Sequence, residues 1–368
     1  MINATITLLL LLINSIVFYK IISKTNNRQF QWFYVGLLLI HSIAFWYSYG
    51  NHVGDLHCDF YQFYSKVKIS KSITDFFGYG HRIMSLIIYP LVKLKFSYFN
   101  IALLFTTLSL QGFYMYYNLI ITSKASLQLK CLFLSLMLLP SLHYWTTSLS
   151  KEAILLFILA VVLVQIRQQK YFSVPIILSV IISFAIRPYI GVIIIVSVVA
   201  HQLFDKTLHV KTKKMLSVLL LALIVIVIPL LLKFLKIDAI SIEAIQKTFQ
   251  KVIVYSQTHG NSSINLVESN YFERLILVLI RPLFFDAQTV SQIIVSLENL
   301  LIFGCLIKVI YNFSYKKYIS SYIRSNVYVI FVVLGVVCFL SIYMYNLGLA
   351  SRLRVMFIPY LFIFLFEQ

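Results

Sequence analysis

Apolar segments recur along the whole chain, and they constrain its fold more than any other feature. A helix needs about 20 mostly apolar residues to cross the hydrocarbon core of a bilayer. Segments that approach this length predict an all-α, polytopic integral membrane protein with about eleven transmembrane helices. The segments comprise residues 3–21, 31–49, 98–121, 129–144, 153–166, 172–186, 189–204, 215–235, 288–310, 326–346 and 354–366.

The amino-acid composition agrees with a chain embedded in a membrane. Of the 368 residues, 60% are hydrophobic and 12% are charged, and the mean hydropathy is +0.89. A soluble domain carries about 25% charged residues, so this chain has too little charged surface to cover a globule in water. The net charge of +19 comes from Lys and Arg residues scattered through short loops, which is typical of membrane proteins near anionic headgroups. We therefore expect membrane lipid as a partner and no nucleic acid.

No internal repeat or low-complexity linker divides the chain, so we expect one membrane domain over residues 1–368. With the N-terminus outside, the inner loops hold 15 of the 31 Lys and Arg residues and one acid. The positive-inside rule, which weighs short loops, then predicts an outside N-terminus and an inside C-terminus. Two long outer loops follow from this topology, at 50–97 and 236–287. The shorter apolar stretches within them, 82–94 and 274–285, are expected to be interfacial or re-entrant helices.

The first outer loop opens with the acidic and aromatic sequence NHVGDLHCDFYQFYSKV, residues 51–67. Asp55 and Asp59 are four residues apart and would share one face of a helix. Two such carboxylates could hold a metal ion or supply a general base, whereas a solvated amphipathic helix explains the same spacing. Three histidines nearby add ligand atoms without the spacing of a dedicated metal site: His52, His57 and His81. We therefore expect no cofactor, and a divalent metal has no clear motif to support it.

A dense group of polar residues interrupts the apolar pattern at LLPSLHYWTTSLSKEAILL, residues 138–156. Ser150 suits the N-cap of the following helix, and Glu152 would lie in its first turn, where the helix dipole favours an anion. The aromatic rings beside them are typical of the membrane interface. Local structure accounts for most of this group, and it leaves His143, Lys151 and Glu152 as candidates for a site at the outer mouth.

Four arginines stand at unusual positions near the predicted outer face. Arg187 and Arg281 each precede a proline, in RPYIG and RPLFF. Proline suits the first turn of a helix, whose free N–H groups attract anions, and an adjacent arginine fork suits phosphate. Arg352 and Arg354 lie at the outer start of the last predicted helix, where the positive-inside rule does not place them. Snorkelling of Arg187 and interfacial anchoring of the last two are the alternative explanations.

Several stretches resemble bacterial polysaccharide polymerases of the Wzy and EpsG-like type, which share features with C-type glycosyltransferases. They are GDLHCDFYQFY (54–64), PSLHYWTTSLSKEA (140–153), RPYIG (187–191), RPLFFDAQTVSQIIVSLENL (281–300) and NLGLASRLRVMFIPYL (346–361). The resemblance implies a bacterial cytoplasmic-membrane enzyme with a catalytic acid in the first outer loop, which points to Asp55 or Asp59. It also implies that four arginines bind the diphosphate of an undecaprenyl diphosphate carrier: Arg187, Arg281, Arg352 and Arg354.

The residues and the resemblance together predict a polymerase that moves a glycan from undecaprenyl diphosphate to an acceptor sugar at the outer face. The candidates for the base that takes the acceptor proton are Asp59, Asp55, Glu152 and His143. Lys151 and Tyr61 are assigned to sugar binding. A chain-length regulator or a flippase would fit as a protein partner. Two alternatives stay open, a flippase of lipid-linked oligosaccharides and, on the basis of a single histidine, a membrane O-acyltransferase.

Overall fold

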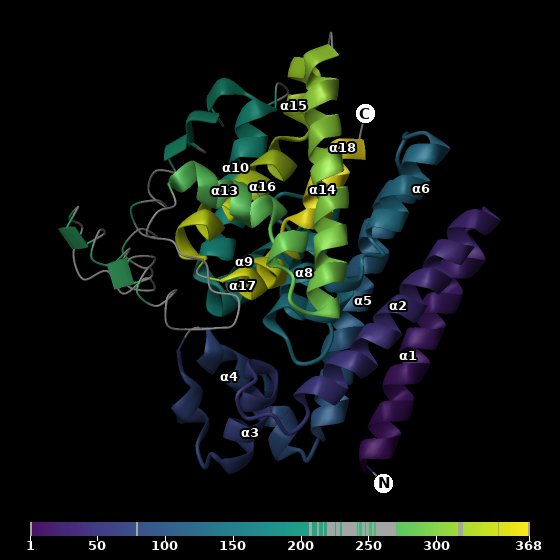
Figure 1. The fold of residues 1–368 in the computed structure, drawn as a ribbon, viewed down its shortest axis with the longest axis vertical. Coiled ribbons are helices and arrows are strands. Elements are labelled where there is room, and N and C mark those ends of the chain that lie inside the picture. Colours follow the sequence, from purple (N-terminus) through teal and green to yellow (C-terminus); the bar gives the residue numbers. More distant parts are fainter. Residues whose placement is uncertain are drawn as a thin grey trace. The chain divides into compact units, whose positions relative to one another are not determined.

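A computed structural model describes residues 2–78, 80–205, 270–315, 319–344 and 346–366, with scattered residues between 208 and 254. Over these residues the chain is helical and contains no strand, as the sequence predicts (Figure 1). The chain divides into two compact units, unit 1 (Met1–Arg187) and unit 2 (Pro188–Gln368). The expectation of one domain stays a prediction, because compactness alone does not decide whether each unit would fold by itself.

Unit 1 is a bundle of helices in which two short helices and a 3-10 turn are inserted between α2 and α5 (Figure 1). Its elements are α1 (Ile2–Lys24), α2 (Arg28–His52), α3 (Asp59–Ile69), η1 (Ile73–Phe76), α4 (His81–Lys93), α5 (Tyr98–Thr122), α6 (Leu127–Leu136), α7 (Pro140–Thr146), α8 (Lys151–Arg167) and α9 (Val174–Ile186). The inserted elements lie within the first predicted outer loop, so that loop is folded rather than extended.

Unit 2 contains the remaining described helices, in which α16 packs against α10, α13 and α18. Its elements are α10 (Pro188–Phe204), α13 (Tyr271–Ile280), η2 (Phe284–Asp286), α14 (Val290–Tyr315), α15 (Ile319–Ser325), α16 (Val327–Tyr343), α17 (Leu347–Arg354) and α18 (Ile358–Phe366). Tyr189 of α10 stacks on Phe339 of α16 with ring centroids 3.9 Å apart. The predicted helix 215–235 and most of the predicted loop 236–287 lie outside the described residues.

Polar side chains set where many of the helices begin. Ser97 accepts a hydrogen bond from the backbone N–H of Asn100, and Ser150 accepts one from Ala153. An N-cap of this kind satisfies one of the backbone donors that a helix start leaves open. Pro140 opens α7 and Pro188 opens α10, at positions where the missing N–H of proline has no cost. The sequence therefore encodes these boundaries locally.

Helices α1 and α5 begin, and α2 ends, at the same end of the unit 1 bundle. Hydrogen bonds join Asn3 of α1 to Asn100 of α5 at 2.9 Å and Asn14 to Thr107 at 2.9 Å, so α1 and α5 run in the same direction. At the C-terminal end of α2, Tyr49 stacks on Tyr98 at the start of α5. Residues 53–97 consequently leave the bundle and return to it at the same end, at which α1 also begins.

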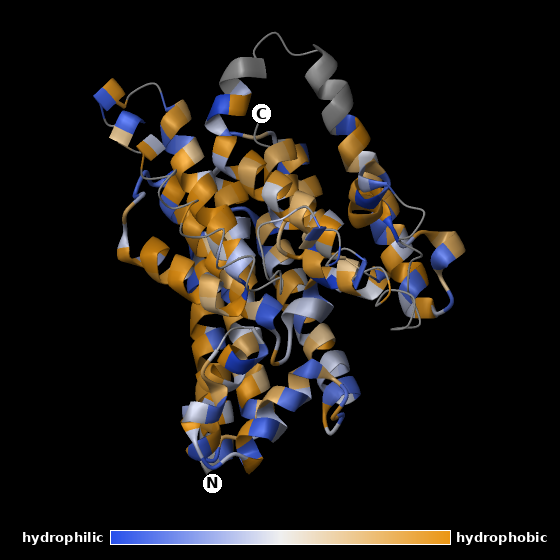
Figure 2. Ribbon diagram, turned by 90° about the vertical axis from the view of Figure 1, so that its left-hand side faces the viewer, coloured by the Kyte–Doolittle hydropathy of each residue, from blue (hydrophilic) through white to orange (hydrophobic). Residues whose placement is uncertain are grey.

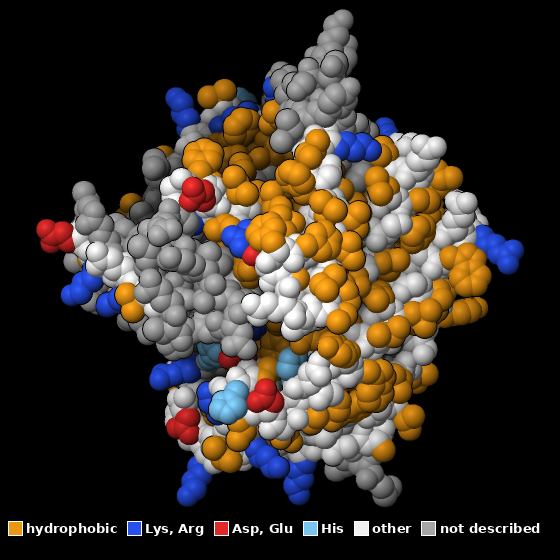
Figure 3. Space-filling view, in the orientation of Figure 1, with side chains coloured by type: hydrophobic (Ala, Val, Ile, Leu, Met, Phe, Trp, Pro, Cys, Tyr) orange, Lys and Arg blue, Asp and Glu red, His pale blue; other side chains and the backbone are white. Residues whose placement is uncertain are grey.

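Three described helices, α1, α2 and α14, are long and apolar enough to cross a membrane. Two bent pairs raise this to as many as five spans, α6 with α7 bent by 51° and α17 with α18 bent by 55°. Side chains of α1 such as Leu8 are exposed, Leu8 by 67%. Figure 2 shows hydrophobic residues along most of the described helices, and Figure 3 shows hydrophobic side chains over much of the described face in view. These helices indicate a membrane protein, and the prediction of about eleven spans is not confirmed.

Candidate functional site

The polar stretch between α7 and α8 is a turn buried inside unit 1. Four hydroxyl residues of the turn are fully buried: Thr146, Thr147, Ser148 and Ser150. Hydrogen bonds that involve hydroxyl groups satisfy polar atoms of the turn. The Ser148 hydroxyl lies 3.1 Å from the Tyr98 hydroxyl, and its backbone N–H donates to the Thr106 hydroxyl. Most of the polar residues that interrupt the apolar sequence therefore have a structural purpose, and the predicted N-cap at Ser150 is confirmed.

Glu152 follows this turn and forms an ion pair with Arg187. A residue that precedes proline is driven out of the helical conformation, so α9 ends at Ile186 and Arg187 becomes its extended C-cap, with φ −144° and ψ 94°. The Glu152 side chain is fully buried, and only 11% of the Arg187 side chain is exposed. A carboxylate at this depth requires a charged partner, and the N-terminus of α8 adds a favourable dipole.

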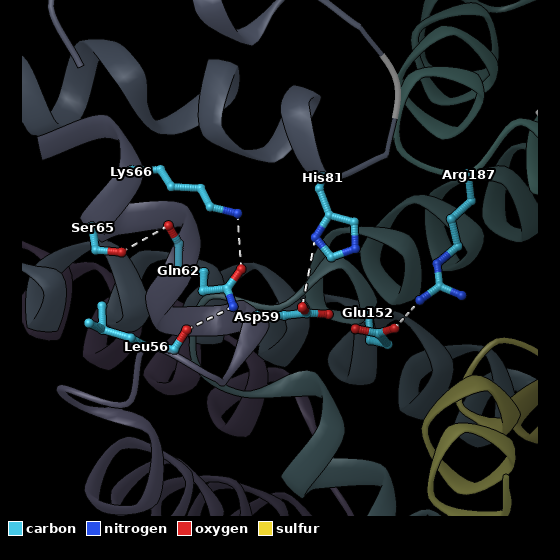
Figure 4. A network of polar contacts seen from close by, with 8 residues as sticks. All are labelled: Leu56, Asp59, Gln62, Ser65, Lys66, His81, Glu152 and Arg187. Atoms are coloured by element: carbon cyan, nitrogen blue, oxygen red, sulfur yellow. Dashed lines mark hydrogen bonds and ion pairs between the residues drawn. The ribbon is translucent and has the colours of Figure 1, made fainter. Parts of the chain in front are cut away.

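Asp59 and His81 form a second pair of an acid with a basic side chain at the same end of unit 1. Both begin helices, Asp59 in α3 and His81 in α4, and Oδ1 of Asp59 lies 3.8 Å from Nδ1 of His81. The Gly80 N–H donates to the carbonyl of Ala185 over 3.1 Å, which ties the start of α4 to the last turn of α9. Figure 4 shows both pairs in one view, with the two carboxylates between His81 and Arg187.

The predicted sugar-binding residues contact aromatic rings of α3 and α5. The Lys151 ammonium lies 5.7 Å from the centre of the Phe63 ring of α3, and the lysine is 7% exposed. Tyr61 of α3 meets Tyr98 edge to face, with centroids 5.0 Å apart. The structure therefore brings Asp59, Lys151 and Glu152 to the packed interface of α3, α4, α8 and α9. Their chemical roles stay predictions.

The prediction that Asp55 and Asp59 share a helix face is wrong. Helix α3 begins at Asp59, and Asp55 lies in the exposed turn before it. There its Oδ1 accepts a hydrogen bond of 2.8 Å from the backbone N–H of His57. Asp55 thus shapes a turn, a common use of aspartate that competes with helix formation. Between the two acids, burial raises the pKa of the Cys58 thiol, which keeps it protonated.

His143 occupies a different environment, inside the bundle. Its Nδ1 lies 3.0 Å from Nδ1 of His41 on α2, and its Nε2 lies 3.0 Å from the carbonyl of Met137. The His41 Nε2 lies 3.0 Å from the Ser109 hydroxyl of α5. Since His143 is fully buried with both ring nitrogens in contact, this geometry suits a link between α2, α5 and α7. Its assignment as a catalytic base remains a prediction.

In unit 2, Arg281 is the extended C-cap of α13 and precedes Pro282 in a cis peptide bond. Its Nε donates to Oδ2 of Asp286 over 2.9 Å, and its Nη2 pairs with Oδ1. Burial alone would raise the pKa of Asp286, but hydrogen bonds from Arg281 and from the Leu283 N–H hold it below its ordinary value of 3.8. Pro282 leads into the short turn η2 rather than an α-helix, so the predicted anion site at a helix start is wrong here.

Arg352 and Arg354 lie in the last turn of α17, before the bend into α18, and not at the start of one final helix. Arg354 is 2% exposed. Its Nε donates to the carbonyl of Val278 at the end of α13 over 2.7 Å, and its Nη1 donates to Oδ1 of Asn299. The amide of Asn299 donates in turn to the carbonyl of Pro282 over 2.6 Å. Arg354 therefore ties α13, α14 and α17 together, and diphosphate binding by either arginine remains a prediction.

Sequence reasoning passed over two side chains that organise these clusters. His41 stands inside an apolar run, where a polar residue is a warning of a specific partner, and that signal was available in the sequence. Asn299 offered no signal, because an asparagine in a predicted span has no fixed role. His81 was considered only as a metal ligand. Among the described residues, no three His, Cys, Asp or Glu side chains gather in a way that would hold a metal ion.

Comparison of the chain with known protein families, with curated proteins and with solved structures finds no match. We therefore infer function from the residues and their arrangement alone.

Proposed function

We propose that the protein is a membrane glycosyltransferase of the polysaccharide-polymerase type, which moves a glycan from undecaprenyl diphosphate to an acceptor sugar at the outer face of the bacterial cytoplasmic membrane. The observation that carries the proposal is the arrangement of two acids and three basic side chains at one end of unit 1. They come from four separate places in the sequence: Asp59, His81, Lys151 with Glu152, and Arg187.

The two acids differ in a way that suits different roles. The Asp59 side chain is 34% exposed and opens a helix on the folded loop, so it is reachable by an acceptor hydroxyl. The Glu152 carboxylate is buried and paired, so it suits the positioning of Arg187. Buried partners hold a charged group in one orientation, which is what a preorganised electrostatic site requires.

In the proposed reaction, the acceptor hydroxyl oxygen attacks the anomeric carbon of the lipid-linked glycan. The bond from that carbon to the diphosphate oxygen breaks, and its electron pair leaves with the diphosphate. Asp59 takes the hydroxyl proton, a contribution of about 10² to 10⁴ in rate. Arg187 stabilises developing negative charge, and removal of one such donor typically costs about 10² to 10³. Binding of the diphosphate by Arg281, Arg352 and Arg354 remains a prediction from the sequence.

The structure supports the alternative activities less well than it supports the proposed transferase. An O-acyltransferase would use His143 as its base, but this histidine is buried and both ring nitrogens have partners. A flippase is expected to carry charges near the middle of the membrane between repeated halves. In the described part of unit 1, the charged cluster lies instead at the end of the bundle where α1 begins.

The test is a gel of surface polysaccharide from a deletion strain complemented with wild type, Asp59→Asn or Asp75→Asn. Asp75 is the matched control, since it is an exposed acid in the same folded loop and contacts Ser70. We expect Asp59→Asn to lower polymer yield by about 10² or more, with single lipid-linked units accumulating outside, and Asp75→Asn to resemble wild type.

Other outcomes of the same experiment would overturn the proposal. Units that accumulate on the inner leaflet of the deletion strain would identify a flippase. Full-length polymer that lacks acyl groups would identify an O-acyltransferase. Unchanged polymer in the deletion strain would exclude a role of the protein in glycan assembly. Equal polymer yields from the two aspartate variants would exclude a role of Asp59 in the reaction.

A further inference from the structure

The ends of α3 and α4 form a basic and apolar edge of unit 1 that the proposed function does not use. The Lys93 ammonium donates to the carbonyl of Ser70 over 2.6 Å, so the C-terminal ends of the two helices lie together. We call this the basic edge, and it comprises Lys66, Lys68, Ile69, Lys71, Ile73, Lys93, Leu94 and Lys95, all of them exposed. Basic side chains project from this side in Figure 3, where Figure 1 shows α3 and α4.

Helix dipoles explain only part of this composition. Lysines in the last turn of a helix complement its partial negative charge, and Lys66, Lys68 and Lys93 hold such positions. Lys71 and Lys95 lie beyond the helix ends. Lys95 also has φ +65°, a left-handed conformation that glycine adopts at much lower cost. The helix dipole therefore does not by itself account for the lysines at these two positions.

The apolar side chains of the basic edge are the second observation. Ile69 is 81% exposed and Leu94 is 64% exposed, each beside lysines. Large aliphatic side chains at this exposure gain nothing from the fold of the protein. Interleaved with lysines, they match segments that lie in the headgroup region, where apolar side chains enter the acyl boundary and lysines remain outside.

The connectivity brings this edge next to helices that include a candidate membrane span. Residues 53–97 start at the end of the membrane-spanning helix α2 and return to α5 at the same end of the bundle, where α1 begins. Between residues 66 and 95 the sequence contains six Lys and Arg residues and one acid. A cluster of this size next to a span is sufficient to attract anionic lipids.

We propose that the basic edge binds the phosphate headgroups of anionic bilayer lipids, with Ile69 and Leu94 inserted among their acyl chains. Contact with the bilayer would hold the folded loop at the membrane surface and thereby fix α3 and α4 there. The inference does not depend on the proposed enzymatic activity. It commits to lipids of the surrounding bilayer, as distinct from free phosphate.

The test measures the acetylation rate of individual lysines by an uncharged ester, read by mass spectrometry on the full-length protein in nanodiscs. One set of nanodiscs contains phosphatidylcholine alone, and the other an equal mixture with phosphatidylglycerol. We expect Lys68, Lys71 and Lys95 to react about fivefold more slowly in the anionic nanodiscs. In the variant Ile69→Ser/Leu94→Ser this protection should largely disappear, because the lysines are no longer held at the surface.

Lys124, an exposed residue in the connection between α5 and α6, is the internal control. Its acetylation rate should be the same in both kinds of nanodisc, in the wild type and in the variant. Such a result would show that the substitutions act locally. Equal rates at the basic edge in both lipids would overturn the proposal, as would protection that survives the double substitution. Protection by inorganic phosphate in phosphatidylcholine nanodiscs, equal to that by anionic lipid, would reassign the edge to a free phosphate ligand.

Discussion

Two Arg-Pro sequences, one at the boundary between the two units and one in unit 2, end a helix in the same way and yet place their arginines in different surroundings. Arg187 caps α9 and Arg281 caps α13, each extended because proline follows. Arg187 pairs with a carboxylate 35 residues away on another helix, whereas Arg281 pairs with one 5 residues away in its own turn. The dipeptide determines where the helix ends, and the fold determines what the arginine meets.

The difference also predicts unequal energetic weight. The Glu152 and Arg187 side chains are 0% and 11% exposed, whereas those of Asp286 and Arg281 are 7% and 29% exposed. Removing one partner of a buried pair leaves an uncompensated charge and is strongly destabilising. A pair near the surface is screened by water and contributes little. Substitutions in the two pairs can therefore test whether burial sets their contribution to stability.

The largest effect is expected for Arg187→Met. The substitution leaves the Glu152 carboxylate buried without its cation, so the free energy of unfolding should fall by about 3–5 kcal/mol. Denaturant titration of the purified protein in detergent micelles measures this change. The double variant Glu152→Gln/Arg187→Met should recover part of the loss, because it removes the stranded charge. Equal stabilities for the single and double variants would show that the pair is not buried as described.

A second comparison concerns two glycines at helix contacts, Gly112 on α5 and Gly335 on α16. A Cβ added to Gly112 would lie 3.0 Å from the backbone Cα of Phe157 on α8, whereas one added to Gly335 would meet side-chain carbons of Ile193 at 3.1 Å. Backbone cannot move aside as a flexible side chain can. We expect Gly112→Ala to destabilise by about 1–3 kcal/mol through overpacking.

For Gly335→Ala, a small shift of Ile193 and the higher helix propensity of alanine, about 0.5–1 kcal/mol, should leave stability nearly unchanged. Thermal unfolding of the two variants side by side checks the difference. A larger loss for Gly335→Ala than for Gly112→Ala would contradict it, and would mean that α10 and α16 pack more rigidly than α5 and α8.

Local sequence information was sufficient for many of the helices. It missed the break that divides the predicted helix 129–144 into α6 and α7, and it was insufficient for the charged cluster. The apolar segments located α1, α2, α5, α8 and α9 closely, and Ser150 marked a helix start, because these features depend on nearby residues. The pairing of Glu152 with Arg187 depends on how α8 and α9 pack, which spacing along the chain does not reveal. Asp55 was misassigned for a related reason, since a side chain that caps its own turn competes with the helix pattern.

The smallest effect is expected at Asp286. Because its folded-state pKa lies below the ordinary value of 3.8, its contribution to stability is fully present above that value and is lost as pH falls through the folded-state pKa. Asp286→Asn should cost about 1 kcal/mol or less at neutral pH, since the Arg281 partner is partly exposed. The variant should also lose stability less steeply than wild type below pH 3.8. Unfolding measured as a function of pH in detergent, with the exposed Asp75→Asn as the control, tests both statements. A cost at neutral pH as large as that of Arg187→Met would remove the distinction between a buried pair made by the fold and a local pair made by one turn.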